Sequence, residues 1–148
     1  MMNVKVISRI PQVQQRLAIS PTQRMYEAVS VIRGQTLITL SGNRSGRTYL
    51  VPGTHKTYTA SAPGEAPAQA TGELREHVST SVETKATNVL GKVGIPESAK
   101  NKITGLSIGD YAICLEYGTT NMAARPWLLP SFNKVKGQVK SILGAKWL

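Results

Sequence analysis

The spacing of the apolar residues changes near residue 118, and this change limits what the second half of the chain can fold into. Ahead of Gly118, large apolar residues occupy every second position, at Tyr111, Ile113, Leu115 and Tyr117. Such alternation is typical of a strand with one buried face, because successive side chains of a strand point to opposite sides. The sequence therefore predicts a strand over residues 111–117 that ends at Gly118.

After Pro126 the apolar residues recur at intervals of four and three, which predicts an amphipathic helix. These residues are Leu128, Phe132, Val135, Val139 and Ile142. Proline is tolerated in the first turn of a helix, where its missing N–H removes no intrahelical bond. We therefore expect the helix to begin between Pro126 and Pro130 and assign residues 126–148 to it.

A second helix is predicted nearer the N-terminus. Ser20 can cap it, Pro21 suits the first helical position, and Gln23 completes a capping box. The helix should run from about residue 21 to 33 or beyond, with Gly34 weakening its end. Before it, residues 4–17 carry a further helical pattern that a proline interrupts.

Residues 42–67 are rich in proline and glycine and predict a projecting β-hairpin. Its strands should lie at 47–51 and 56–60, joined by a loop of about four residues, with Tyr49 facing Tyr58. The segment has few large apolar side chains for a core, so it can either contact a neighbouring subunit or remain a solvated excursion. Its candidate contact residues are Arg44, Arg47, Tyr49, His55, Lys56 and Tyr58.

Between these elements we expect a short helix over 72–79 and strands within 81–95, with Gly91 and Gly94 marking a turn or bulge. The chain is then a single α+β domain over residues 1–148. In it, a small, mainly antiparallel sheet is packed by the N-terminal and C-terminal helices, because two-layer packing buries one apolar face of each element.

The chain carries a formal charge of +10, but the charge is unevenly distributed. Residues 1–60 hold eight Lys or Arg and one acid, residues 61–117 hold five and seven, and the remainder holds five and none. One positive face could attract nucleic acid or an acidic protein ring, or the lysines of the last helix could simply face solvent. No helix-turn-helix pair, zinc-finger spacing or stacking-aromatic motif accompanies the charge.

We find no sequence pattern for catalysis, a cofactor or a metal. The nucleophile elbow, the phosphate-binding loop and the paired-histidine zinc motif are missing from the sequence, so we do not expect an enzyme. Neither His55 nor His77 stands at ligand spacing from Cys114, for which we expect a buried apolar role. No apolar run approaches the roughly 20 residues needed to span a bilayer. We expect a soluble protein made in the cytoplasm.

Two blocks of the sequence resemble a known family. The first is Tyr111 and Ala112, then Glu116-Tyr117-Gly118-Thr119, followed by Ala124 or Arg125, Pro126, Trp127, Leu128 and Pro130. It is similar to the C-terminal signature of the tail-completion, or head–tail joining, proteins of long-tailed bacteriophages. The second block, 61–67 followed by Thr71-Gly72-Glu73-Leu74, resembles that family's Pro-rich stretch and helix start. Together they cover residues 61–132.

The resemblance implies a structural virion protein of the phage neck, made in the host cytoplasm and located at the head–tail interface. It implies a homo-oligomeric ring, six-fold or twelve-fold, that contacts other neck and tail proteins. DNA would pass through its channel without sequence-specific contact. A tail terminator, a head-closure ring and a non-specific DNA-binding module remain alternatives.

Overall fold

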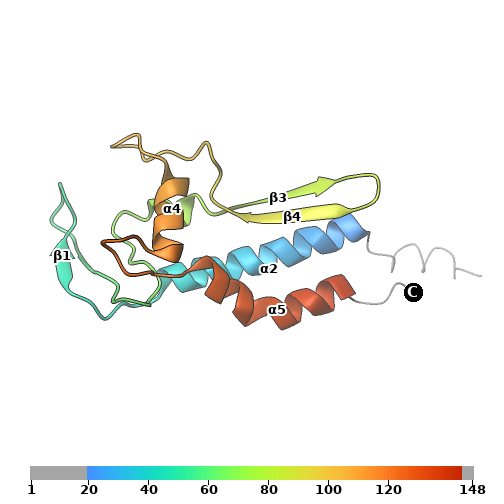
Figure 1. The fold of residues 1–148 in the computed structure, drawn as a ribbon, viewed down its shortest axis with the longest axis horizontal. Helices are drawn as coiled ribbons and strands as arrows, with labels where there is room; N and C mark the ends of the chain where they lie inside the picture. The colour runs from blue at the N-terminus through green and yellow to red at the C-terminus, as the bar shows by residue number, and fades with distance from the viewer. Residues whose placement is uncertain (1–19, 145–148) are drawn as a thin grey trace, which may run out of the picture.

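The computed structural model describes residues 20–144 and contains helices and two small antiparallel sheets (Figure 1), which confirms the α+β class. The expected helical pattern at 4–17 lies outside the described residues. In chain order the elements are α2 (Pro21–Ser41), β1 (Thr48–Leu50), β2 (Thr57–Thr59), α3 (Glu73–Glu76), β3 (Ser79–Thr84), β4 (Val89–Gly94), α4 (Ile108–Tyr117) and α5 (Leu128–Gly144). No helix among residues 20–144 is long and apolar enough to cross a bilayer.

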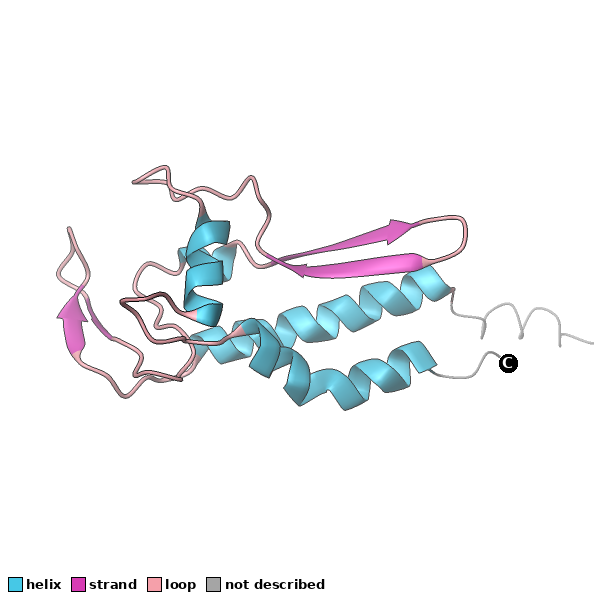
Figure 2. Ribbon diagram, in the orientation of Figure 1, coloured by secondary structure: helices cyan, strands magenta, loops and turns pink. Residues whose placement is uncertain are grey.

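Helix α2 is the centre of the fold. The β3–β4 hairpin packs on one side of it and α5 runs along another (Figures 1 and 2). The sequence predicted two helices packed on one sheet, whereas here α2 covers the sheet and α5 packs against α2. The strands also form two separate two-stranded sheets, β1–β2 and β3–β4.

Helix α2 begins as predicted and continues further than its minimum expected length. The Ser20 hydroxyl accepts a hydrogen bond from the Gln23 N–H at 3.2 Å, and Pro21 opens the first turn. The helix then passes through Gly34 and ends at Ser41. Its last turns bury Thr36 and Leu40, and this packing outweighs the roughly 1 kcal/mol that a glycine costs inside a helix.

The prediction that Gly91 and Gly94 mark a turn or bulge is wrong, because both lie in β4 and pair in unbroken register with Val82 and Ser79. The chain reverses at residues 85–88, where the Lys85 N–H donates to the Asn88 carbonyl at 2.8 Å, and Gly91 lies inside β4. A Cβ added to Gly91 would stand 2.6 Å from Cγ1 of Val29 on α2. Glycine is present because the strand lies directly on the helix, where no side chain fits.

The predicted strand at 111–117 is also wrong, because these residues belong to helix α4. The Ser107 hydroxyl caps the helix by accepting from the Asp110 N–H at 3.2 Å. The buried residues are Ile108, Ala112 and Leu115, whose spacing of four and three is helical. They join a core cluster made of Leu40, Val78, Ala112, Leu115 and Trp127.

Helix α5 begins at Leu128, inside the predicted window of 126–130. It meets α2 through small polar side chains: Ser131, fully buried, donates its hydroxyl to the Thr39 hydroxyl at 2.8 Å. Small residues at this position allow the two helices to approach closely. Helix α3 is shorter than the predicted 72–79, since β3 already begins at Ser79.

The predicted hairpin is confirmed as β1–β2. Tyr49 pairs with Tyr58, and their ring centroids are 6.0 Å apart. The Val51 N–H donates to the Lys56 carbonyl, which leaves a four-residue loop in which Gly53 has a φ of 75°. The hairpin stands at one end of the molecule, away from the β3–β4 hairpin (Figure 1).

Candidate assembly surface

The base of the β1–β2 hairpin is fixed to the body of the protein by Arg44. Its guanidinium donates to the carbonyls of Thr39 and Gly42 at 2.7 Å each and of Pro67 at 3.0 Å, and it also reaches Asn43. These carbonyls belong to the end of α2 and to both ends of the loop. Arg44, predicted as a subunit contact, therefore has an internal anchoring role in the structure.

Glu65 closes the same loop from its other end. Its carboxylate accepts from the hydroxyl of Ser45 at 2.6 Å and from the N–H groups of Ser45 and Ala62 at 3.1 and 2.9 Å. These hydrogen bonds, led by the Ser45 hydroxyl, lower the pKa of Glu65 from 4.5 to about 2. Glu65 lies in the family-like block 61–67, but its role in the loop could not be predicted from sequence because its partner Ser45 is distant along the chain.

Acid should loosen the base of the hairpin. Because the folded-state pKa of Glu65 lies below its ordinary value, its stabilising effect is complete above about pH 4.5 and is lost as the pH falls toward about 2. Nuclear magnetic resonance should show the amide shifts of Ser45 and Ala62 moving together over this window. The Glu65→Gln variant should lack that titration. Shifts that move identically in both proteins would contradict the assignment.

The hairpin itself, over residues 47–59, carries exposed basic and apolar side chains. Arg47, His55 and Lys56 are exposed, and neither Arg47 nor Lys56 forms an ion pair with any residue of 20–144. Tyr49 and Leu50 are 49% and 59% exposed. Leu50 was not among the predicted contact residues, although its place next to Tyr49 in β1 could have indicated it. Together these residues make a projecting surface that its own domain leaves uncovered.

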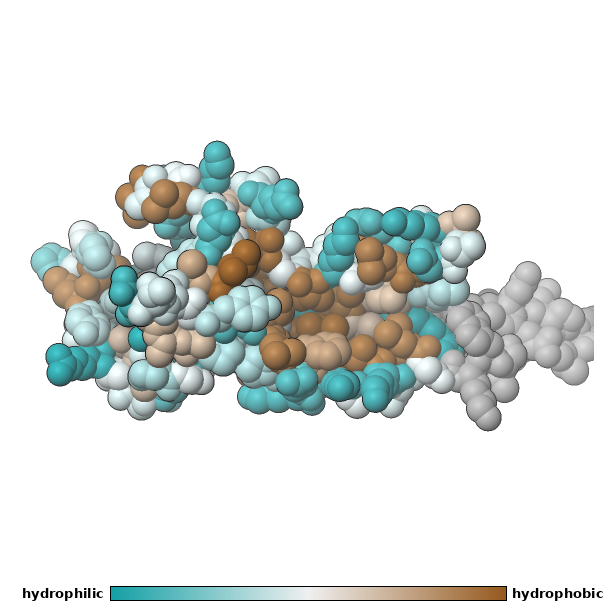
Figure 3. Space-filling model, in the orientation of Figure 1, coloured by the Kyte–Doolittle hydropathy of each residue, from teal (hydrophilic) through white to brown (hydrophobic). Residues whose placement is uncertain are grey.

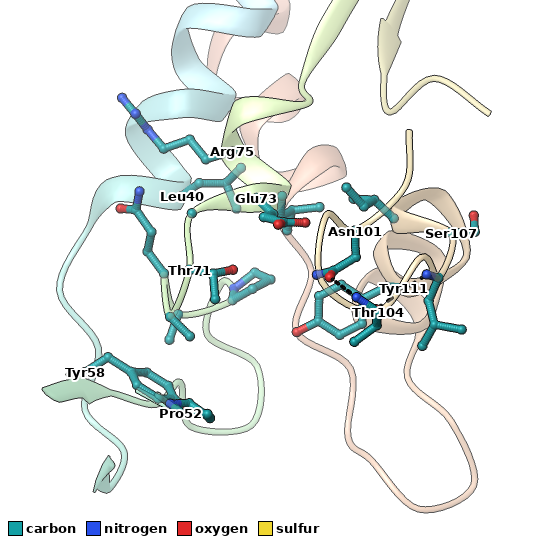
Figure 4. A pocket seen from close by; sticks show the side chains of 18 residues that line it. Leu40, Pro52, Tyr58, Thr71, Glu73, Arg75, Asn101, Thr104, Ser107 and Tyr111 are labelled. Atoms are coloured by element: carbon teal, nitrogen blue, oxygen red, sulfur yellow. Dashed lines mark hydrogen bonds between the residues drawn. The ribbon is translucent and has the colours of Figure 1, made fainter. Parts of the chain in front are cut away.

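A cleft of about 410 Å³ separates the hairpin from α4 (Figure 4). Tyr58 and Pro52 line it from the hairpin, and Tyr111 and Thr104 line it from the opposite side. Tyr58, predicted as a subunit contact, is half-buried and turned toward this cleft. The cleft therefore lies between the hairpin and one side of α4.

Glu116, a residue of the first family-like block, caps α5. Its carboxylate accepts from the N–H groups of Trp127, Leu128 and Leu129 at 2.8, 3.0 and 3.0 Å. The next residue, Pro130, has no N–H. The four backbone nitrogens that open α5 are therefore all accounted for, and the negative charge also stabilises the positive end of the helix dipole.

Removing this cap should destabilise the protein measurably. We expect Glu116→Ala to lower the free energy of unfolding by about 2 kcal/mol, because three donors lose their acceptor at once. Glu116→Gln keeps one acceptor oxygen and should lose less. Urea denaturation measures both. Equal losses for the two variants would show that the charge and the second oxygen contribute nothing.

Residues 124 and 125 of the first family-like block contact the second block, residues 61–67. The Arg125 guanidinium donates to the Ser61 carbonyl at 3.4 Å, and the Gly64 N–H donates to the Ala124 carbonyl at 3.0 Å. The backbone N–H of Arg125 also donates a hydrogen bond to the Leu115 carbonyl at 2.7 Å. Segments far apart in sequence thus form one unit at the base of the hairpin.

The other motif residues serve the turn between α4 and α5. Gly118 ends α4 with a φ of 77°, and Thr119 pairs with Met122 through an N–H to carbonyl bond of 2.8 Å. Pro126 is half-buried and Trp127 is buried, while Tyr117 is exposed.

Within residues 20–144, no group of three or more metal-ligating side chains gathers in one place. Cys114 is a free, half-buried thiol on α4, not the fully buried residue we expected. Comparisons with protein families, with curated proteins and with solved structures found no match.

Proposed function

We propose that this protein is a structural subunit of the bacteriophage neck, which forms a ring that completes the tail and joins it to the head. One observation carries the proposal. The two sequence blocks that resemble the head–tail joining family lie against each other, linked by Arg125 to Ser61 and by Ala124 to Gly64. Such contact is what we expect if both blocks serve one conserved structural unit.

The hairpin adds support for an assembling protein. Its base is held by Arg44 and Glu65, while its strands carry exposed Tyr49 and Leu50. Arg47 and Lys56 form no ion pair with residues 20–144. Exposed apolar side chains on a projecting hairpin with a fixed base are characteristic of a surface that another protein covers. A tail terminator or a head-closure ring would use the same device, so the proposal extends to these neighbouring rings as alternatives.

Deleting the hairpin should separate folding from assembly. The deletion should span 47–59, with a short Gly-Ser linker from Gly46 to Ala60, because these two residues already pair through an N–H to carbonyl bond of 2.9 Å. Arg44 and Glu65 then keep their partners. We expect normal circular dichroism, yet no complementation of a phage that lacks the gene. Electron microscopy of that phage should show full heads beside finished, unattached tails.

Charge reversal on the hairpin is a milder test than the deletion and has a matched control. Arg47→Glu with Lys56→Glu should weaken complementation, since exposed charge pairs are each worth only about 0.2–1 kcal/mol. Lys85→Glu, on the distant β3–β4 turn, should leave it unchanged. Normal infectivity after the deletion would show that the hairpin is a passive excursion. Normal head–tail joining without the protein would remove the proposed function itself.

Helix α5 favours a second candidate, a non-specific DNA-binding module. Lys134, Lys136 and Lys140 are exposed and have no acidic partner within residues 20–144. Duplex DNA binding by the isolated protein that weakens steeply with salt, and that Lys136→Glu with Lys140→Glu abolishes, would support this candidate. Salt-insensitive or undetectable binding would reject it.

A further inference from the structure

A groove of about 560 Å³ runs beside α4, and its charge is opposite to that of the molecule. Three of the eight acidic residues of the chain line it, namely Glu97, Asp110 and Glu116, and no lysine or arginine does. In a protein with eighteen basic residues, such a concentration of acids is exceptional. The groove is therefore a local site of negative potential.

The groove also has an apolar wall that its own domain leaves open. Ile113 and Tyr117 on α4 line it and are 59% and 79% exposed. Glu116 is committed to the N-terminus of α5, but the side chains of Glu97 and Asp110 form no hydrogen bond or ion pair with residues 20–144. A partner that fits here must bring apolar side chains and positive charge together.

The β1–β2 hairpin has this combination of properties, but it lies on the other side of α4 in its own chain. Tyr111 and Ile108 face the cleft that Tyr58 lines, whereas Ile113 and Tyr117 line the groove. At about 100° per residue these two pairs lie on opposite sides of the helix. In this structure the hairpin therefore does not fill its own groove.

We propose that the α4 groove binds the β1–β2 hairpin of a second copy of this chain. Arg47, Tyr49 and Lys56 share one face of the hairpin, because side chains alternate along each strand. Tyr49 of one copy then covers Ile113 and Tyr117 of the next, while the two basic residues approach Asp110 and Glu97. Because the two surfaces differ, the contact is head-to-tail and repeats from copy to copy, closing into a ring if the rotation permits. This inference rests on the proposed ring-forming function and names the interface within it.

Disulfide trapping in the full chain tests the contact directly. In a Cys114→Ser background, one protein carries Tyr49→Cys and the other carries Ile113→Cys. Under mild oxidation we expect the mixture to form a disulfide between the two proteins, since a bridge needs Cα atoms within about 7 Å. Pairing Tyr49→Cys with Leu90→Cys, on the distant strand β4, is the control and should give no bridge.

Charge exchange provides an independent readout by native mass spectrometry. Arg47→Glu with Lys56→Glu should weaken self-association roughly tenfold, and so should Glu97→Lys with Asp110→Lys, because each removes two charge pairs. The protein with all four changes should recover association, since the charges are again complementary. Recovery would not follow if either pair acted only on folding.

The possible failures are distinguishable. If the ring forms but the disulfide does not, and the charge changes do not affect self-association, this interface is wrong. The proposed neck function is not contradicted by that result. If Glu97→Lys with Asp110→Lys abolishes head–tail joining without affecting the ring, the groove binds a different neck protein, and the second-copy occupant is wrong. A chain that stays monomeric and unbridged at its highest soluble concentration also overturns the interface. The function itself is decided separately, by the particles that lack the protein.

Discussion

Trp127→Ala should lower the free energy of unfolding by about 3–5 kcal/mol, close to the whole stability of a small domain. Trp127 is only 2% exposed and packs in the core cluster with Leu40, Val78, Ala112 and Leu115. Its indole N–H also donates to the Ala112 carbonyl at 3.4 Å. The substitution removes a large side chain from the place where α2, α4 and the start of α5 meet, so it should leave a cavity that these elements cannot close.

Thermal unfolding measures this effect. For a protein of this size we expect about 2–4 °C of melting temperature per kcal/mol, so the variant should melt about 6–20 °C lower or be insoluble. Trp127→Phe is the control, because it retains most of the apolar volume and loses only the indole N–H and part of the ring. An unchanged melting temperature for Trp127→Ala would mean that Trp127 belongs to an exposed assembly surface and not to the core.

The sequence was sufficient for elements whose signals are local. The cap at Ser20, the start of α5 between two prolines, and the pairing of Tyr49 with Tyr58 each depend on a few neighbouring residues, and each was predicted correctly. The α+β class followed from these elements. Local chemistry of caps and turns is largely independent of the rest of the fold, which is why it can be read from sequence.

The segment 111–117 was mispredicted because its apolar pattern fits both the two-residue period of a strand and the 3.6-residue period of a helix. Apolar residues at every second position imply a strand, but Ile108, Ala112 and Leu115 also share one face of a helix. The helical pattern can be recognised only when Ile108 is included, and Ile108 lies outside the alternating run. Tyr111, Ile113 and Tyr117, which suggested the buried face of a strand, are all exposed in the helix.

The candidate site was predictable in its residues but only partly in their roles. The motif residues Glu116, Gly118 and Trp127 were found from the sequence, yet the capping of α5 by Glu116 depends on how α4 and α5 meet. The internal role of Arg44 and the closure by Glu65 also depend on contacts between distant segments. The acidic groove was hidden because Glu97 and Asp110 come together only through the fold.

Gly118→Val should destabilise the protein about as strongly as loss of Trp127. Gly118 has φ 77° and ψ 178°, a region of backbone space that is open almost only to glycine and costs other residues about 1–3 kcal/mol. A Cβ there would also stand 2.8 Å from the Ala124 nitrogen and 2.9 Å from the Met122 oxygen, both of them backbone atoms. Overpacking of this kind adds about 1–3 kcal/mol, so the total is about 2–6 kcal/mol.

Gly105→Val separates the two causes, because Gly105 has a similar φ of 70° but nothing within 4 Å of an added Cβ. It should show only the backbone cost, while Gly137→Ala, in an open position of α5, should be neutral or slightly stabilising. By urea denaturation, the free energy of unfolding of Gly118→Val should therefore be well below that of Gly105→Val. The free energy of unfolding of Gly137→Ala should equal or exceed that of the original protein. If Gly118→Val and Gly105→Val lost equal stability, the close approach of residues 122–124 to Gly118 would have no energetic consequence. The tight turn from α4 into α5 would then depend on φ alone.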